Sequence, residues 1–176
     1  VESLARGIEE RAAVIQAERP LAWGPGRQAL RSNLAPDIPQ ASFQLLLEHL
    51  EAIGHLRLRG EGVRVGESKP EAAGEAAKWV ADAEKLWREA GLKPPSKDEL
   101  AELGVPADQV PDLLDYLLDR DALIRTSSEF IVHAEAFAGF LAGLRELFSE
   151  QEVLAVGDIG QHFDISRRYS VPLLEY

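Results

Sequence analysis

The 176-residue sequence contains no cysteine, no methionine and no long run of apolar residues. Without cysteine there is no disulfide framework, no thiol nucleophile and no thiolate metal site. The longest apolar runs are three or four residues, as at Leu45–Leu47, and are far too short to span a membrane. No basic and apolar leader opens the sequence, so we expect a cytoplasmic protein without a membrane partner. The lack of methionine at position 1 suggests a fragment of something longer.

Basic residues are few compared with acidic ones: 19 Lys and Arg stand against 30 Asp and Glu, a formal net charge of −11. The balance is nine against nine in residues 1–70, seven against fifteen in 71–137, and three against six in 138–176. Non-specific binding to a nucleic-acid duplex needs a broad basic face. Any nucleic-acid contact of this chain must therefore be small and local.

A short block recurs three times along the chain, with two leucines, an acidic residue and a ring-bearing residue. The copies lie at 46–49, 113–116 and 173–176. Their spacing of 67 and 60 residues suits small domains rather than most solenoid repeats. Alternating apolar and polar residues around a turn follow the first two copies and predict β-hairpins at 56–65 and 123–132.

Apolar residues at helical spacing precede each block, at 4–15, 76–90 and 137–148, where Leu141 and Phe148 extend the last apolar face. A shorter helix follows each stretch, and the clearest begins with the capping box of Ser96 and Glu99. Helix, helix, turn, helix and hairpin in about 65 residues is the winged-helix arrangement. We predict a mainly α fold of tandem winged-helix (helix-turn-helix plus β-hairpin) domains with small β wings. The modules cover 1–69, 70–137 and 138–176, the third stopping before its wing.

The two joints between these modules differ. Residues 66–70, Gly-Glu-Ser-Lys-Pro, are typical of a flexible linker and predict a hinge near Pro70. By contrast, residues 133–136 run almost directly from the second hairpin into a helix. We therefore expect modules two and three to hold a nearly fixed relation.

Residue groups typical of enzymes are scarce. No glycine-rich loop carries the Lys-Ser or Lys-Thr pair of a nucleoside-triphosphate site. The four histidines stand at spacings that fit no common metal motif. Paired carboxylates such as Glu9-Glu10 fit solvated helix surfaces. We expect no enzyme activity, no metal and no cofactor in this chain.

One stretch of the third module departs from the other two. Arg167, Arg168 and Tyr169 stand where the second module has Ala107-Asp108-Gln109 and the first has Gln40-Ala41-Ser42. Ser166 is a good helix N-cap, but two arginines in a first helical turn oppose the helix dipole. An anion at the same helix end would reverse that penalty.

Guanidinium groups and a tyrosine ring suit RNA with flipped-out bases, through phosphate or guanine contacts and stacking. The structural alternative is that Arg167 and Arg168 merely solvate a turn while Tyr169 packs inward. Pro172 leaves the start of the helix open: either the helix bends, or it begins nearer Ser170. Both possibilities leave the arginines exposed.

The first module offers weaker candidates. Its predicted hairpin carries three arginines, Arg57, Arg59 and Arg64, which could contact tRNA or ribosomal RNA. Solvent-facing strand positions are normally polar in any case, so this pattern has a structural explanation as well. The acidic second module is expected to be a spacer, since Asp108 would repel phosphate where Arg168 attracts it.

The run from Ser166 to Tyr176 resembles the signature of the last winged-helix module in the bacterial selenocysteine-specific elongation factors (SelB). Residues 156–159 and Phe163 also fit, whereas the first two modules match in pattern. The resemblance implies the second, third and fourth winged-helix modules of that family. It also implies that the last module recognises the selenocysteine insertion (SECIS) hairpin of the mRNA, through Ser166, Arg167, Arg168 and Tyr169.

The same resemblance implies a GTPase part outside this chain, which would bind GTP and Mg²⁺ and deliver selenocysteyl-tRNA to the ribosome. We expect a monomer. Two other functions stay open, a protein–protein scaffold and a transcription regulator that binds DNA. The regulator would need basic recognition helices in more than one module. For the scaffold, charge reversal at Arg167 and Arg168 should leave partner binding unchanged.

Overall fold

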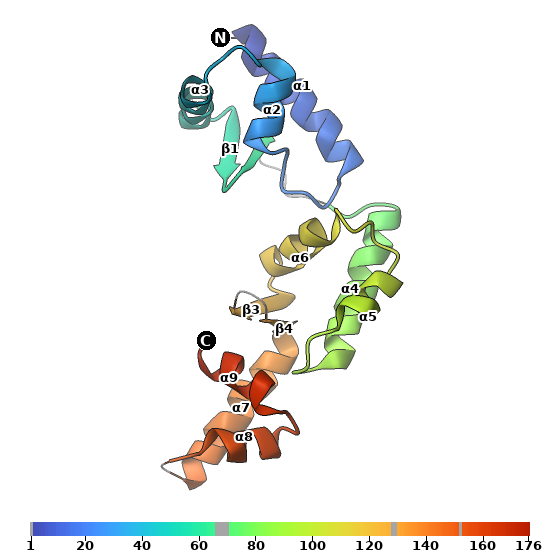
Figure 1. Cartoon of the computed structure of the whole chain (residues 1–176), viewed down its shortest axis with the longest axis vertical. Coiled ribbons are helices and arrows are strands. Elements are labelled where there is room, and N and C mark those ends of the chain that lie inside the picture. The colour runs from blue at the N-terminus through green and yellow to red at the C-terminus, as the bar shows by residue number, and fades with distance from the viewer. Residues whose placement is uncertain (1, 66–70, 128–129, 152) are drawn as a thin grey trace. The chain divides into compact units, whose positions relative to one another are not determined.

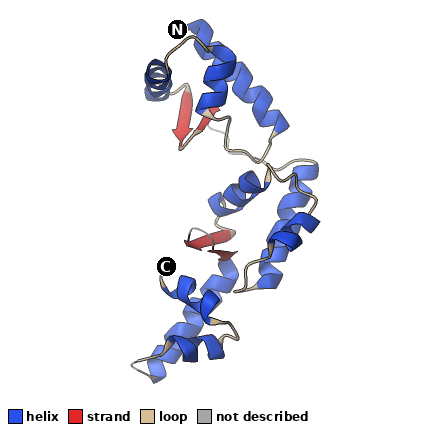
Figure 2. Ribbon diagram, viewed as in Figure 1, coloured by secondary structure: helices blue, strands red, loops and turns tan. Residues whose placement is uncertain are grey.

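The computed structural model of the chain describes residues 2–65, 71–127, 130–151 and 153–176 (Figure 1). Helices dominate this part of the chain, and its strands form two separate antiparallel sheets of two strands each (Figure 2). The predicted mainly α fold with small β wings is confirmed. Two compact units are present: Val1–Ala76 with Pro111–Tyr116, and Ala77–Val110 with Leu117–Tyr176. The three module boundaries remain predictions.

Unit 1 contains a complete winged helix. Its elements are α1 (Glu2–Glu18), α2 (Arg27–Leu34), α3 (Gln40–Ala52), β1 (Leu56–Arg59) and β2 (Gly62–Val65). Helix α1 ends just before Pro20, which has no backbone N–H to continue the helix. Strands β1 and β2 pair Leu56 with Val65 and Arg59 with Gly62, and Gly60 between them has a φ of +52°. The predicted first hairpin is therefore confirmed.

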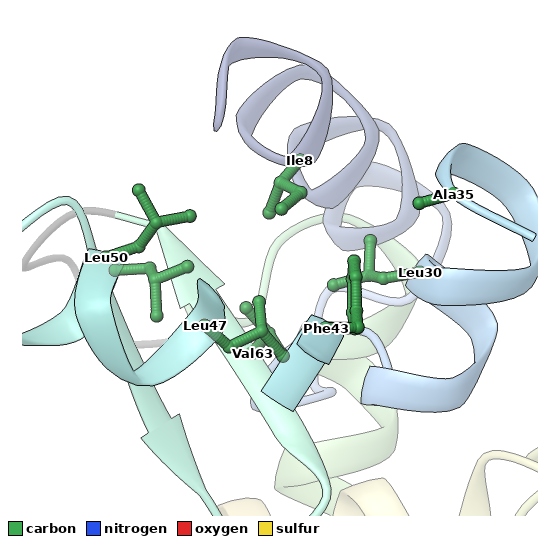
Figure 3. Close-up of a cluster of buried hydrophobic side chains, with 8 residues drawn as sticks. Ile8, Leu30, Ala35, Phe43, Leu47, Leu50 and Val63 are labelled. Atoms are coloured by element: carbon green, nitrogen blue, oxygen red, sulfur yellow. The ribbon is translucent and has the colours of Figure 1, made fainter. Parts of the chain in front are cut away.

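The core of unit 1 lies where the three helices meet the wing (Figure 3). Ile8 of α1, Leu30 of α2 and Leu47 of α3 point toward one another and are fully buried. Val63 of β2 joins them from the wing and is also fully buried. Each such side chain contributes about 1.5–3 kcal/mol when it leaves water. This burial attaches the wing to the helices.

The segment before α2 pairs with strand β2 of the first wing through backbone hydrogen bonds. Val63 N–H donates to the Pro25 carbonyl over 2.9 Å, and Arg27 N–H donates to the Glu61 carbonyl over 2.8 Å. A Cβ at Gly24 would lie 2.1 Å from the Val63 carbonyl oxygen, so only glycine allows this approach. The 23–26 segment consequently lies along the outer edge of β2.

The remaining elements follow the same helix and strand order. They are α4 (Glu75–Ala90), α5 (Lys97–Glu102), α6 (Val110–Asp119), β3 (Leu123–Ser127), β4 (Phe130–His133), α7 (Ala134–Glu150), α8 (Val156–His162) and α9 (Arg167–Leu174). Trp87 of α4 donates its indole N–H to the buried Ile131 carbonyl of β4 over 3.0 Å. Strands β3 and β4 are antiparallel, as the sequence predicts. None of the helices in the described ranges is long and apolar enough to cross a membrane.

One hydrophobic core joins the second wing to the last three helices. Phe130 and Val132 of β4 share it with Phe140 of α7, Ile159 of α8 and Leu173 of α9. The step from β4 into α7 is direct: His133 is the N-cap, and its Nδ1 accepts a hydrogen bond from the Glu135 N–H over 3.2 Å. The fixed relation expected of modules two and three stays a prediction. The expected flexible linker at 66–70, with its hinge near Pro70, lies outside the described residues.

The apolar face expected for 137–148 is narrower than its spacing suggests. Phe137 and Phe140 are buried, but Leu141 is 37% exposed and Phe148 is 51% exposed. The side of α7 that carries the two exposed residues was therefore wrongly assigned to the core. Helices pack along one stripe, and β4, α8 and α9 cover only the stripe through Phe137, Phe140 and Leu144.

The capping box of α5 is present as predicted. The Ser96 hydroxyl accepts from the Glu99 N–H over 3.3 Å, and the Glu99 carboxylate accepts from the Ser96 N–H over 2.8 Å. Hydrogen bonds from the Ser96 backbone and hydroxyl hold the pKa of Glu99 below its ordinary value. The stabilisation from this carboxylate is therefore present at neutral pH and lost as the pH falls through the lowered pKa.

Replacing the cap residue tests this local account. Ser96→Ala should lower the stability of α5 by about 1 kcal/mol at neutral pH, because the Glu99 N–H loses its acceptor. Amide hydrogen exchange of residues 97–102 should show weaker protection than in the unmodified chain. The variant also loses the hydrogen bond that the Ser96 hydroxyl donates to the Glu99 carboxylate over 2.7 Å, so the difference should narrow in acid, where protonation of that carboxylate weakens this bond in the unmodified chain. Equal protection at neutral pH would contradict the capping role.

Candidate nucleic-acid interface

The turn between α8 and α9 is a well-defined helix end. Ile165 N–H donates to the Gly160 carbonyl over 2.9 Å, and Asp164 N–H donates to the Gln161 carbonyl over 3.3 Å. These two bonds form a Schellman motif, which needs a left-handed residue just after the helix. Asp164 fills that position with a φ of +51°, and Gly104 has a φ of +69° at the matching place sixty residues earlier.

A close contact between α8 and α9 follows from this turn, and Figure 1 shows the two helices side by side. Gly160 is buried, and a Cβ there would lie only 2.8 Å from the Ile165 carbonyl oxygen. Ser170 faces the same contact, is fully buried, and has its Oγ 3.5 Å from both the Ser166 and the Arg167 carbonyls. Small residues at 160 and 170 thus hold the first turn of α9 against α8.

Helix α9 begins at Arg167, with Ser166 as its N-cap. The Ser166 backbone is extended (φ −74°, ψ 162°), and its carbonyl accepts from the Ser170 N–H over 3.1 Å. Its hydroxyl makes no capping hydrogen bond. Pro172 lies inside the helix, so the Arg168 carbonyl has no helical donor. The open question about the helix start is settled in favour of Arg167.

Arg167 and Arg168 are both exposed at this helix end. In the part of the chain that the structure describes, neither guanidinium makes an ion pair. The Arg168 guanidinium carbon lies 5.8 Å from the centroid of the Tyr169 ring, near the limit of a cation–π contact. Two adjacent cations without carboxylate partners can bind an anionic ligand without first breaking an ion pair.

Tyr169 has a structural role in addition to any contact with ligand. It is half-buried, packs against the shared core, and its ring centroid lies 5.8 Å from that of Phe130 in β4. The two rings are tilted by 46°. Tyr169 therefore anchors the first turn of α9 to the second wing, and it offers a ligand less open ring surface than the sequence suggests.

A hollow of about 610 Å³ opens beside the turn. Its lining comes from α8, the turn and the first turn of α9, including Gln161, Ser166 and Arg167. Lys93, from the α4–α5 loop, also lines it, and its Nζ lies 3.3 Å from Asp164 Oδ2. The basic end of α9, with its two arginines, thus has a third cation close by.

The three arginines of the first wing do not form one surface. Arg57 and Arg59 are exposed on β1, but Arg64 on β2 is only 3% exposed. The Arg64 Nη1 donates to the Trp23 carbonyl over 2.9 Å, and burial lowers the pKa of its guanidinium. The hypothesis that Arg64 contacts nucleic acid is therefore wrong, because the 23–26 segment covers it. Arg57 and Arg59 remain candidates.

Comparison with known proteins bears on both units. Residues 16–64 match the family model described as elongation factor SelB, winged helix. Over 158 residues, or 89% of its length, the chain is 25% identical to the selenocysteine-specific elongation factor of Desulfomicrobium baculatum. The predicted resemblance to SelB is confirmed. The match at 16–64 covers α2, α3, β1 and most of β2, so this winged helix is similar to the one of SelB.

A solved structure of a bacterial selenocysteine-specific elongation factor, EF-Sec, has the same fold. It superposes with a TM-score of 0.62 and 18% identity over 99% of this chain. The chain spans 25% of the length of the D. baculatum factor and 26% of the EF-Sec chain. It thus spans about a quarter of each of these two proteins.

The sequence did not indicate a role for three residues near the start of α9. Gly160 and Ser170 are ordinary helix residues in sequence, and only the close approach of α8 and α9 gives them weight. Lys93 lies 71 residues before its partner Asp164, in a module expected to be a spacer. One signal in the sequence was available for this turn: Asp164 aligns with Gly104, and a glycine there indicates a left-handed residue after the helix.

Two glycines of α8 provide a matched test of the α8–α9 contact. Gly160→Ala should destabilise the chain by about 1–3 kcal/mol, because its Cβ would meet the Ile165 carbonyl. Gly157→Ala, with open space around its Cβ, should be neutral or stabilise by about 0.5–1 kcal/mol. Urea denaturation of both variants measures the difference. Equal effects would show that the helices are not in close contact.

Arg57 and Arg64 are paired across the first wing, and substituting each of them tests whether Arg64 has a structural role. Arg64→Ala should cost about 2–3 kcal/mol through lost packing and an unfilled carbonyl at Trp23. Arg57→Ala, at an exposed position, should cost under about 0.5 kcal/mol. Thermal unfolding followed by tryptophan fluorescence reports both values. A small loss of stability for Arg64→Ala would contradict its structural role and make Arg64 a candidate for nucleic-acid contact again.

Proposed function

We propose that this chain is the mRNA-binding part of a selenocysteine-specific elongation factor and that the N-terminal end of α9 binds the SECIS hairpin. The observation that carries the proposal is the exposed Arg167–Arg168 pair, which has no ion-pair partner among the described residues, in a chain of net charge −11. The SelB-type winged helix of unit 1 supports it independently.

The arrangement at α9 favours an anion on physical grounds. The first backbone N–H groups of a helix lack internal acceptors, and the helix dipole places partial positive charge there. Arg167 and Arg168 add two full charges at that end, which disfavours the helix in isolation. An RNA phosphate at the same place interacts favourably with all of these groups. Guanidinium forks can also bind guanine edges through paired hydrogen bonds.

The acidic remainder of the chain contributes selectivity. A basic site of two arginines neutralises few phosphates, so its affinity depends only weakly on salt. The surrounding negative charge disfavours long duplexes, which present phosphate over a wide area. Binding then requires an RNA that places its contacts at one corner, as a hairpin with unpaired bases does.

The rest of such a factor would supply the remaining steps. A GTPase part with GTP and Mg²⁺ would carry selenocysteyl-tRNA to the ribosome, while this chain links it to the hairpin. Arg57 and Arg59 of the first wing are secondary candidates for tRNA or ribosomal RNA. The chain would act as a monomer and would not itself catalyse a reaction.

Charge reversal tests the proposed site. The double variant Arg167→Glu/Arg168→Glu should lose several kcal/mol of hairpin affinity, from two charge-assisted contacts of about 1.5–3 kcal/mol each. The control Lys78→Glu/Lys85→Glu makes the same change in net charge on α4 and should bind nearly as the unmodified chain does. Fluorescence anisotropy with a labelled SECIS hairpin measures both.

A scrambled hairpin of the same length completes the experiment. The unmodified chain should bind it far more weakly than the SECIS hairpin. Equal affinity for the two RNAs would contradict selective recognition. If the double reversal left hairpin binding unchanged, the α9 site would be wrong and the scaffold function would gain support.

A further inference from the structure

The α4–α5 loop places a cation of the second module at the edge of the third. Gly91 ends α4 with a φ of +63°, and Lys93 N–H donates to the Ala90 carbonyl over 3.1 Å. Leu92, between them, packs against the core that contains Ile165 and Leu173. Two prolines at 94–95 restrict the backbone that follows. Lys93 is therefore held in place by its own backbone and by the burial of its neighbour.

This fixed backbone brings Lys93 to the hollow that Arg167 lines. The Lys93 side chain is half exposed, and the side chain of its partner Asp164 is fully exposed. Ion pairs in such positions are weak, because water screens them and both side chains lose freedom on pairing. A phosphate in the hollow can therefore replace Asp164 as the partner of Lys93 at little cost. With Lys93 and Arg167 opposite one aspartate, the lining has a net positive charge.

Asp164 has no conformational advantage at its position. A left-handed φ is less costly for glycine, which the second module has at the matching Gly104. What Asp164 adds is a carboxylate within 3.3 Å of Lys93. That carboxylate holds the ammonium beside the hollow when no ligand is present, and it repels phosphate at the same time.

We infer that Lys93 is a second RNA contact, which binds a backbone phosphate beside the one bound by Arg167. The hairpin backbone then crosses from the third module onto the α4–α5 loop of the second, along the hollow. The second module is in this respect part of the binding surface rather than only a spacer. This inference rests on the proposed function, and it adds a residue and a path for the RNA.

Removal of the single charge tests the contact. Lys93→Ala should weaken binding of the SECIS hairpin by about tenfold, the size of one charge-assisted hydrogen bond. The slope of log Kd against log salt concentration should become shallower by about 0.7–0.9, as expected for one lost phosphate. Lys93→Arg should bind nearly as the unmodified chain does. The matched control Lys78→Ala, about 20 Å away along α4, should change neither quantity.

Variants of Asp164 distinguish a phosphate contact of Lys93 from an ion pair that is purely structural. Asp164→Asn keeps a residue that tolerates the left-handed φ and frees Lys93, so it should tighten binding several-fold. If the ion pair only joined the two modules, Asp164→Asn and Lys93→Ala would weaken binding alike, and the inference would be overturned. Asp164→Gly, which relieves the backbone as well, should also tighten binding and guards against a folding artefact.

The outcomes distinguish this inference from the function on which it rests. Unchanged affinity and salt slope in Lys93→Ala, with a clear loss in Arg167→Ala, would overturn the Lys93 contact and leave the α9 site intact. If Arg167→Ala also bound normally, the proposed function itself would fail.

Discussion

The candidate site at the start of α9 depends on one close contact, between the backbone of the α8–α9 turn and Gly160. The Ile165 carbonyl oxygen lies only 2.8 Å from the position that a Cβ at residue 160 would take. Because the turn is so close to α8, Ile165 and Ser170 are buried and α9 begins at Arg167. The two arginines are then at the exposed end of a short helix that cannot rotate without exposing its apolar side. Their exposure is a consequence of packing on the opposite face.

The same packing extends into the second module. Phe130 and Val132 of the second wing share a core with α7, α8 and α9, and Tyr169 contacts Phe130 directly. Leu92 enters this core from the α4–α5 loop and brings Lys93 with it. The candidate site is therefore built on elements of two modules that have one core. A mutation in the second wing can therefore move the first turn of α9, and the two arginines with it, from a distance.

Local patterns in the sequence predicted most of the fold and part of the site. The alternation around Gly60 predicted the first wing, and both hydrogen bonds of the predicted Ser96–Glu99 capping box are present. The exposed position of Arg167 followed from its place in a helical first turn. Contacts between distant segments could not be predicted: Arg64 is covered by a segment some forty residues earlier, and Lys93 meets Asp164 across 71 residues. Periodicity describes one element at a time and contains no information on which element covers another.

RNA binding at the start of α9 is tested most directly by observing the arginine side chains themselves while the hairpin is added. In a chain labelled with ¹⁵N-arginine, the Nε–Hε resonances of Arg167 and Arg168 should shift and exchange more slowly with water when the SECIS hairpin is added. Those of the buried Arg64 should stay unchanged, which makes it an internal reference. If the hairpin bound while the resonances of Arg167 and Arg168 did not move, the RNA would lie elsewhere on the molecule and the central claim would be contradicted.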